Sequence, residues 1–381
     1  MGKAERSAMN TRRALIVAAL ALAMATAARS GHELPVYPSY YPHEIEFRTI
    51  APDDAAVLLS EAKLHAYIGG ALRFPGAVPE HVQEVDTVGS YVVVRVNSSS
   101  PQSADEKTHC AIASAVLQAI AASPGDVILH PYPIMPLHGD YLNHVDLAAA
   151  AKARLLDERP PPADDLKVKA DGFAKNLIPA AWRASSAKWD AEIVEVRIAD
   201  LIGPRTVVTN AWEGPPSIRA GWLQAYLLLG GNSPRNLDSD VDRLQVGEFK
   251  SAAERINLER DLVTALTSRC HTTVAGYRMK REYINNEFSA GVENLAFDAL
   301  TGLNTPVFLR TVKLKDFPWN GWLALGLEDH PHAAWNPIAG FTDPYGRLLW
   351  SAIGDPAALP SPYDDTWMLN RISEVQISPK R

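Results

Sequence analysis

The densest group of side chains that could do chemistry lies between residues 130 and 146. His130, His138 and His144 are three of the eleven histidines in the chain, and Asp140 lies between the last two. Neutral imidazole and carboxylate groups together suit divalent transition metals such as Zn²⁺ and Cu²⁺. The stretch also leaves the carboxyl end of a predicted strand, where α/β sheets usually keep their ligand sites. We therefore predict a zinc or copper site with His138, Asp140, His144 and His130 as its candidate ligands, and no other cofactor.

The same stretch also has a purely structural explanation. Its two His-x-Asp pairs match no known metal motif, and Asp146 suits the cap of a helix that starts near His144. Met135, by contrast, supplies a soft sulfur that favours copper. The metal site and the structural loop both remain open interpretations of these residues.

Tyrosines near this stretch are candidate contacts for a small polar ligand. Tyr132 and Tyr141 belong to the same proline-shaped loop, and Tyr67 lies in a short predicted strand that ends at Gly69-Gly70. We name these three tyrosines as the candidate ligand-binding residues.

Histidines elsewhere are weaker candidates. His32 and His43 flank a segment rich in proline and tyrosine, and they either complete a metal sphere begun by His138 or lie on the surface of an extended arm. His330 and His332 follow two acidic residues, a pattern more typical of a solvated turn than of a site.

Composition and missing motifs disfavour several classes of protein. Of 381 residues, 47% are apolar and 21% are charged, which is ordinary for a globular protein with a sizeable core. The formal charge of −7, without a block of like charges, argues against a nucleic-acid partner. The sequence has no G-x-G-x-x-G, P-loop, G-x-S-x-G, H-E-x-x-H or C-x-x-C motif, which disfavours a standard nucleotide enzyme, a serine hydrolase or a zincin protease.

The first thirty residues predict export. Arg12 and Arg13 precede an apolar run from Ala14 to Ala28, which is shorter than the roughly 20 residues that a membrane span needs, and small residues end it. A signal peptide over residues 1–30 places the mature protein in the periplasm or outside the cell, with no membrane span after cleavage. An uncleaved anchor and a twin-arginine signal are the alternatives.

Two cysteines, Cys110 and Cys270, remain for an oxidising compartment, which allows one disulfide. Ser103 and Glu106 predict a capping box before the first cysteine, and apolar spacing puts both cysteines on core-facing stripes of helices. Two outcomes stay open, a cross-link between the helices or two separate buried thiols, because pairing needs Cα atoms within about 7 Å.

Strand-like and helix-like stretches alternate over residues 44–158. The nearly continuous apolar run Tyr91–Val96 is the clearest strand and suits a buried position. This order predicts an α/β N-terminal part with a mixed sheet. The later chain predicts an α+β part that ends in β-rich, Trp-rich segments, including 307–314, 322–327 and 347–350.

The consecutive prolines after Arg159 mark the best linker, because they forbid both a helix and a central strand. The predicted organisation is therefore a signal peptide (1–30), an α/β domain with a Pro/Tyr-rich arm (31–158), a linker (159–166) and an α+β domain (167–381).

The order of a strand, a helix and a short strand ending in Gly-Gly in the first domain is similar to that in solute-binding proteins of transport systems, and Asp53 to Gly70 covers eighteen residues of this likeness. The resemblance implies an exported binding protein that holds an ion or a small polar molecule in a cleft between the two parts. Two alternatives remain. One is an exported metalloenzyme with the same metal site, for which Asp146 and Glu44 are only guesses for a general base. The other is a non-catalytic partner of an envelope complex. The absence of a catalytic motif favours binding.

Overall fold

The computed structural model describes residues 42–103, 105–157, 165–184, 188–201, 219–230, 235–287, 291–316, 321–332, 343–354 and 357–374, all of which belong to the unit Tyr41–Arg381. The predicted signal peptide, His32 and most of the predicted linker lie outside these residues. No helix within the described ranges has both the length and the apolar character to cross a membrane.

One mixed sheet of eight strands organises the described residues. Its order is β1-β10-β2-β7-β3-β6-β5, and β4 pairs with β7 off this path. The pairs β1–β10, β10–β2 and β5–β6 are parallel, whereas β7 is antiparallel to its three neighbours and β3 is antiparallel to β6. The strands are β1 (Glu44–Thr49), β2 (Ala66–Ile68), β3 (Val82–Val96), β4 (Ile128–Leu129), β5 (Val168–Ala170), β6 (Ala191–Arg197), β7 (Thr272–Asn285) and β10 (Trp322–Leu327).

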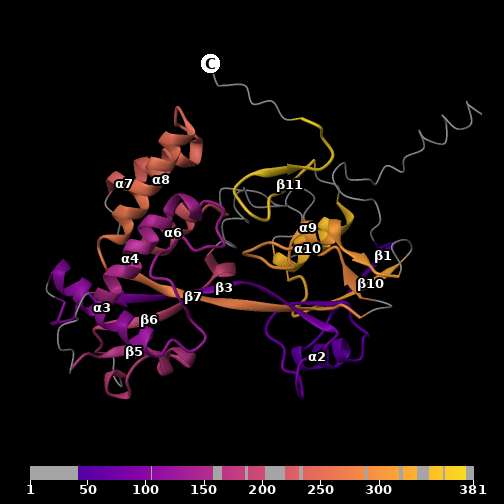
Figure 1. Cartoon of the computed structure of the whole chain (residues 1–381), viewed down its shortest axis with the longest axis horizontal. Helices are drawn as coiled ribbons and strands as arrows, with labels where there is room; N and C mark the ends of the chain where they lie inside the picture. Colours follow the sequence, from indigo (N-terminus) through magenta and orange to yellow (C-terminus); the bar gives the residue numbers. More distant parts are fainter. Residues whose placement is uncertain are drawn as a thin grey trace, which may run out of the picture. The chain divides into compact units, whose positions relative to one another are not determined.

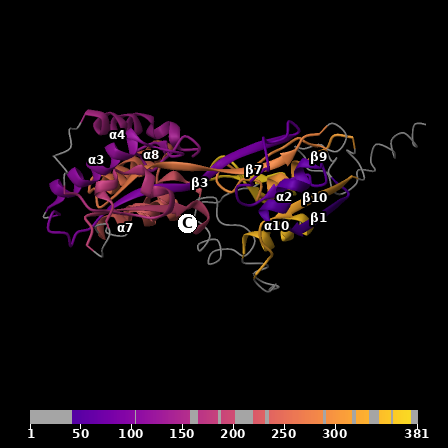
Figure 2. The same cartoon turned by 90° about the horizontal axis from the view of Figure 1, so that it is seen from below.

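The two long strands β3 and β7 join the sheet into one structure. Consecutive valines, Val92, Val93 and Val94, are fully buried in β3, as expected for a strand covered on both faces. Helices α3, α4 and α8 gather near one end of β3 and β7, and α2 and α10 lie near the other end with β1 and β10 (Figures 1 and 2). A mixed α/β arrangement with a mixed sheet is thus confirmed, but the sheet is not confined to the predicted N-terminal part. The domain division stays a prediction, although strands from both sides of 159–166 share this sheet.

Helices cover the sheet where apolar residues recur at helical spacing. The predicted helices near Asp53, Cys110 and His144 are all present as α2, α3 and α4. The α-helices are α2 (Pro52–Ser60), α3 (Glu106–Ala122), α4 (Val145–Asp157), α6 (Gly221–Leu229), α7 (Arg235–Val246), α8 (Ala252–Thr267), α9 (Pro306–Thr311) and α10 (Pro344–Ile353). Short 3₁₀ helices are η1 (Tyr141–His144), η2 (Gly172–Leu177) and η3 (Ala180–Trp182).

The C-terminal part contains more helix than the sequence predicts. Residues 307–314 and 347–350 were expected as strands, but α9 occupies most of the first segment and α10 contains the second. Both helices have a proline in the first turn, where its missing N–H costs nothing. Asp343 also accepts the Gly346 N–H at 2.8 Å, which fixes the start of α10. The other strands in this region are short, and they form two antiparallel two-stranded sheets, β8 (Val292–Glu293) with β9 (Lys313–Leu314) and β11 (Ala358–Pro360) with β12 (Trp367–Leu369).

Cys110 and Cys270 form a disulfide, with their Cα atoms 4.9 Å apart. Cys110 lies on α3 as predicted, but Cys270 does not lie on a helix. Helix α8 ends at Thr267, and Cys270 follows it in a left-handed conformation with φ 55°. The predicted capping box of α3 is wrong as well. Asp105, not Ser103, caps the helix, and its carboxylate accepts the Thr108 N–H at 2.8 Å.

Candidate cation site

The loop that follows β4 packs into the hydrophobic core. Ile134 and Met135 are fully buried, and they join a cluster with Trp222 of α6 and Leu262 of α8. This packing holds the loop against α6 and α8, and the Met135 side chain is part of the hydrophobic core. The polar side chains of the loop are therefore placed by tertiary packing as well as by local turns.

Asp140 lies at the N-terminus of α6. The Gly221 N–H donates to Asp140 Oδ2 at 2.8 Å, which places the carboxylate near the positive end of the helix dipole. A Cβ atom on Gly221 would lie 2.8 Å from Asp140 Oδ1, so that only glycine allows this approach. Oδ1 itself is buried and has no hydrogen-bond partner among the described residues.

His144 ends the 3₁₀ helix η1 and is fully buried. Its Nδ1 lies 2.9 Å from the Tyr132 hydroxyl, whereas Nε2 is buried without a partner in the described part of the chain. Burial lowers the pKa of His144, and the nearby Asp140 carboxylate opposes this effect only partly. His144 is therefore expected to be neutral at pH 7, as a metal ligand must be.

Glu259 brings a second carboxylate from α8. It is buried, and its Oε1 accepts a hydrogen bond from Arg255 Nε at 2.7 Å. Burial raises the pKa of Glu259, while the Arg255 guanidinium pulls it down. The next residue, Arg260, fixes this part of α8 against the loop, because it pairs with Asp146 at 2.6 Å and donates to the Asn143 carbonyl.

Asp140, His144 and Glu259 together have the composition of a metal centre. Each offers one ligand atom, and these three atoms lie within 4.8 Å of one another. Buried polar atoms in native proteins almost always have a partner, so the two unpaired atoms, Asp140 Oδ1 and His144 Nε2, require one. A divalent cation would satisfy both atoms and offset the charge of the carboxylates. We refer to these three residues as the inner cluster.

The other two predicted ligands, His130 and His138, have different partners. His138 Nδ1 accepts the Met135 N–H at 3.1 Å, and His138 Nε2 lies 2.9 Å from Gln224 Oε1, to which it donates. His130 Nε2 donates to the Ile134 carbonyl at 2.8 Å. These hydrogen bonds join residues of the loop to one another and to Gln224 of α6. Of the four predicted ligands, Asp140 and His144 thus belong to the inner cluster, and His138 and His130 do not.

The three tyrosines named from the sequence lie in different surroundings. Tyr132 contacts His144, and the Tyr141 ring centroid lies 5.9 Å from that of His130. Tyr67 is buried in another core cluster, where its hydroxyl donates to the Ile50 carbonyl at 3.2 Å and burial raises its pKa to about 12. His43 is exposed, and its backbone N–H bonds to the Gly321 carbonyl at 2.8 Å.

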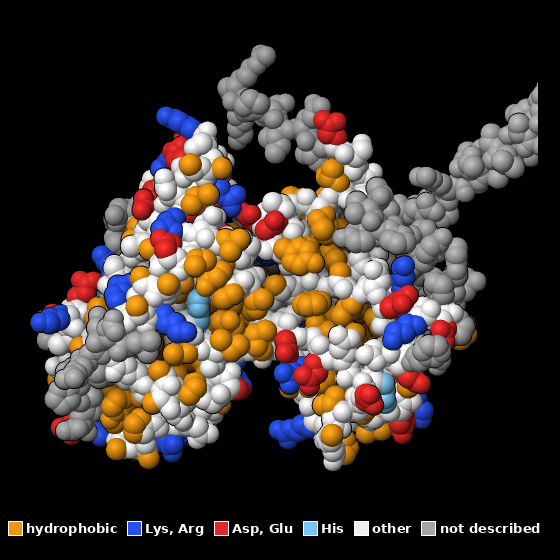
Figure 3. Space-filling view, in the orientation of Figure 1, with side chains coloured by type: hydrophobic (Ala, Val, Ile, Leu, Met, Phe, Trp, Pro, Cys, Tyr) orange, Lys and Arg blue, Asp and Glu red, His pale blue; other side chains and the backbone are white. Residues whose placement is uncertain are grey.

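A cavity of about 260 Å³ adjoins the inner cluster. Acidic side chains outnumber basic ones in its wall, which suits a positively charged occupant. Leu142 and Tyr363, each next to a lining residue in the sequence, are exposed. Hydrophobic side chains gather near acidic ones in the middle of the face of the molecule that Figure 3 shows. The cavity is lined by Gly139, Asp140, Asn143, Arg219, Ala220, Ala252, Arg255, Ile256, Glu259, Asp364 and Asp365.

Sequence reasoning missed Glu259. The available signal is its position on α8, because Glu259 lies three and four residues before the buried Leu262 and Val263 and four residues after Arg255. A carboxylate on the apolar face of a helix, with arginine one turn earlier, predicts a buried and paired acid.

Comparisons with known proteins give a distant structural match only. No family model matches the chain, and no curated protein matches it. HbpA2 from Haemophilus parasuis is 12% identical, with a TM-score of 0.39, and the match covers 70% of this chain and 57% of that one. The periplasmic binding protein DppA from Helicobacter pylori, solved with a peptide, is 10% identical, with a TM-score of 0.40 and coverage of 70% and 56%.

NikZ from Campylobacter jejuni, solved with Ni(L-His), is 9% identical, with a TM-score of 0.33 and coverage of 64% and 56%. The chain spans less than two thirds of the length of each of these three proteins. It thus matches periplasmic binding proteins distantly over part of its length, and its function has to be inferred from its own residues.

Proposed function

We propose that the protein is an exported binding protein that holds a divalent transition-metal ion, of which Zn²⁺ is the best probe, at Asp140, His144 and Glu259. The observation that carries the proposal is the pair of buried, unpartnered atoms Asp140 Oδ1 and His144 Nε2 beside a third ligand. Leaving such atoms unsatisfied costs about 1–3 kcal/mol each, and a bound cation removes that cost.

The surroundings of His144 suit a metal ligand. When Nε2 binds a cation, Nδ1 carries the ring proton and donates a hydrogen bond to the Tyr132 hydroxyl oxygen, 2.9 Å away. The Asp140 carboxylate is held independently by the Gly221 N–H, so that both ligands are oriented before an ion arrives. The adjoining cavity leaves space for water or a small polar ligand beside the ion.

Binding is a better account of this site than catalysis. A metalloenzyme needs a general base near the metal, and the sequence offers Asp146 and Glu44 as guesses. Arg260 binds the Asp146 carboxylate and holds its pKa well below its usual range, which makes it a poor proton acceptor. Glu44 lies in β1, on the edge strand of the sheet.

Equilibrium dialysis against Zn²⁺ tests the proposal on the full chain purified without a chelator. We expect the wild type to bind one ion at the inner cluster, and His144→Ala and Asp140→Asn each to remove that ion. His43→Ala, which removes an exposed histidine, is the matched control. Thermal melts without metal verify that each variant folds. The same number of bound ions in the wild type and in both inner variants would contradict the proposal, as would a wild type that binds no Zn²⁺.

A further inference from the structure

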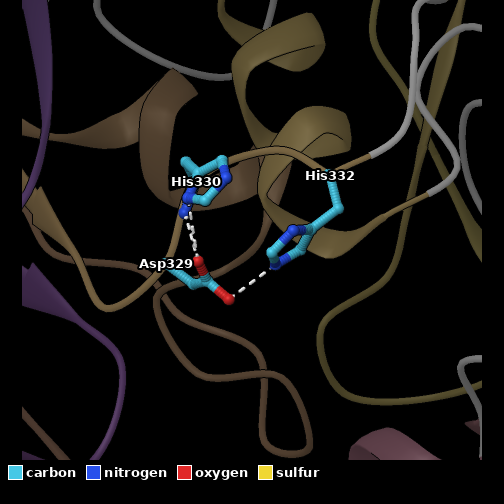
Figure 4. Close-up of side chains that lie close together, drawn as sticks. All are labelled: Asp329, His330 and His332. Atoms are coloured by element: carbon cyan, nitrogen blue, oxygen red, sulfur yellow. Dashed lines mark hydrogen bonds and ion pairs between the residues drawn. The ribbon is translucent and has the colours of Figure 1, made fainter.

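A second group of metal-binding side chains lies directly after β10. Asp329, His330 and His332 each offer one ligand atom, and these atoms lie within 4.8 Å of one another. His332 Nε2 is 2.6 Å from Asp329 Oδ2, and His330 Nδ1 is 3.1 Å from Asp329 Oδ1. Both imidazole rings therefore turn toward one carboxylate (Figure 4). We refer to these three residues as the outer cluster.

The backbone before the outer cluster is held in place. Strand β10 is parallel to both of its neighbours, so the outer cluster lies at the carboxyl end of this parallel group. The Glu328 N–H donates to the Ile68 carbonyl at 3.2 Å. The Glu328 side chain lies close against Gly69, where an added Cβ would be 2.6 Å from Glu328 Cβ. These contacts hold the backbone in place immediately before Asp329.

The two histidines are close enough to share an ion. Pro331 between them restricts the backbone, because its φ is locked near −65°. The ring centroids are 4.6 Å apart, and the planes are tilted by 52°. The side chains of Asp329, His330 and His332 are 45%, 65% and 60% exposed, so that an ion can enter from solvent and keep water as its remaining ligands.

We propose that Asp329, His330 and His332 form a second, solvent-accessible site for a divalent transition-metal ion such as Zn²⁺ or Ni²⁺. Two imidazoles and one carboxylate are a ligand set that these borderline ions accept. The Asp329 carboxylate contacts both rings and holds them near one another before binding, and a bound ion replaces these contacts with coordination. This site does not depend on the inner cluster.

Calorimetric titration with Zn²⁺, and separately with Ni²⁺, tests this site in the His144→Ala background, which lacks the inner ligand. We expect one remaining ion, and we expect His332→Ala or His330→Ala to weaken its binding at least about tenfold, since even outer-shell ligand partners are worth that much. His43→Ala again serves as the control for an exposed histidine.

The outcomes of the two proposals are separable. An ion that the His144→Ala protein no longer binds is assigned to the inner cluster. An ion that is lost when His330→Ala or His332→Ala is added is assigned to the outer cluster. The outer site is overturned if the His144→Ala protein binds no ion, if both outer variants bind as it does, or if His43→Ala weakens binding equally. Because the outer side chains are exposed, their removal is expected to leave the thermal melt unchanged.

Discussion

The inner and outer clusters contain the same kinds of ligand but are assembled differently. The inner cluster takes Asp140 and His144 from one loop and Glu259 from α8, which is far along the chain. The outer cluster lies within four consecutive residues, Asp329 to His332. The inner cluster is largely buried, whereas the histidines of the outer cluster are exposed to solvent. The comparison shows that similar donors can be positioned either by tertiary packing or by local backbone.

This difference determines what each cluster depends on. The inner ligands meet only when α6, α8 and the loop after β4 are packed, so binding there is coupled to folding. The outer ligands stay near one another as long as the turn after β10 holds. Perturbing the tertiary structure should therefore affect the inner cluster first, and the three predictions below use this to test the comparison.

Removing the disulfide should have the largest effect. Cys110→Ser with Cys270→Ser opens a loop of sequence separation 160, for which chain entropy predicts a loss of up to about 5 kcal/mol in the free energy of unfolding. Urea unfolding measures the loss. Because Cys270 follows α8, which carries Glu259, Zn²⁺ binding at the inner cluster should fail at lower urea than binding at the outer cluster. An unchanged unfolding midpoint, or simultaneous loss of both ions, would contradict this prediction.

Gly221→Ala should have a smaller and more local effect. The added Cβ would lie 2.8 Å from both Asp140 Oδ1 and Ile134 Cγ2, so the carboxylate or the loop must shift. We expect a loss of about 1–3 kcal/mol in stability and weaker Zn²⁺ binding at the inner cluster only. Gly76→Ala is the matched control, since no described atom lies within 4 Å of its added Cβ. Wild-type affinity of the inner cluster in Gly221→Ala would show that the close approach to Asp140 is unimportant.

Acid should destabilise the metal-free protein through its buried histidines. Burial lowers the folded pKa of His138 and His144 below the unfolded value of about 6.5. Between these values the unfolded chain binds more protons, so this contribution is complete above about pH 6.5 and is lost as pH falls toward the folded pKa. The slope should be about 1.4 kcal/mol per pH unit for each such histidine.

Urea unfolding at pH 7.5, 6.5 and 5.5 measures this slope, and His144→Gln should reduce it. His332→Ala in the outer cluster provides the comparison for an exposed histidine. A slope that is the same in wild type and His144→Gln would show that this imidazole is already protonated, or solvated, in the folded protein.

Local sequence patterns predicted much of the secondary structure. The strand at 322–327 and the helices that became α2 and α4 follow from apolar spacing and from start signals. The segments at 307–314 and 347–350 were misread because a short apolar run fits a strand and a buried helix equally well. Proline in the first turn of α9 and α10 was the signal that distinguished them.

The candidate site was predicted only in part, for a physical reason. Asp140 and His144 could be found because they are neighbours in a loop with unusual composition. The sequence pattern of α8 predicts that Glu259 is a buried, paired acid but not that it lies beside this loop, since the ion pair of Arg260 with Asp146 and the packing of α8 bring it there. His138 and His130 looked like equal candidates, but Gln224 and the Ile134 carbonyl engage them, and both partners are set by the folded loop.

The pairing of β3 with β7 has a consequence for the order of folding. β3 (Val82–Val96) is complete early in synthesis, but its neighbour β7 (Thr272–Asn285) is made much later. Until then the side of β3 that pairs with β7, including its apolar run Tyr91–Val94, has no partner, and exposed edges of this kind promote aggregation. A newly made chain therefore has to avoid contacts with other chains along this edge until Asn285, the last residue of β7, has been made.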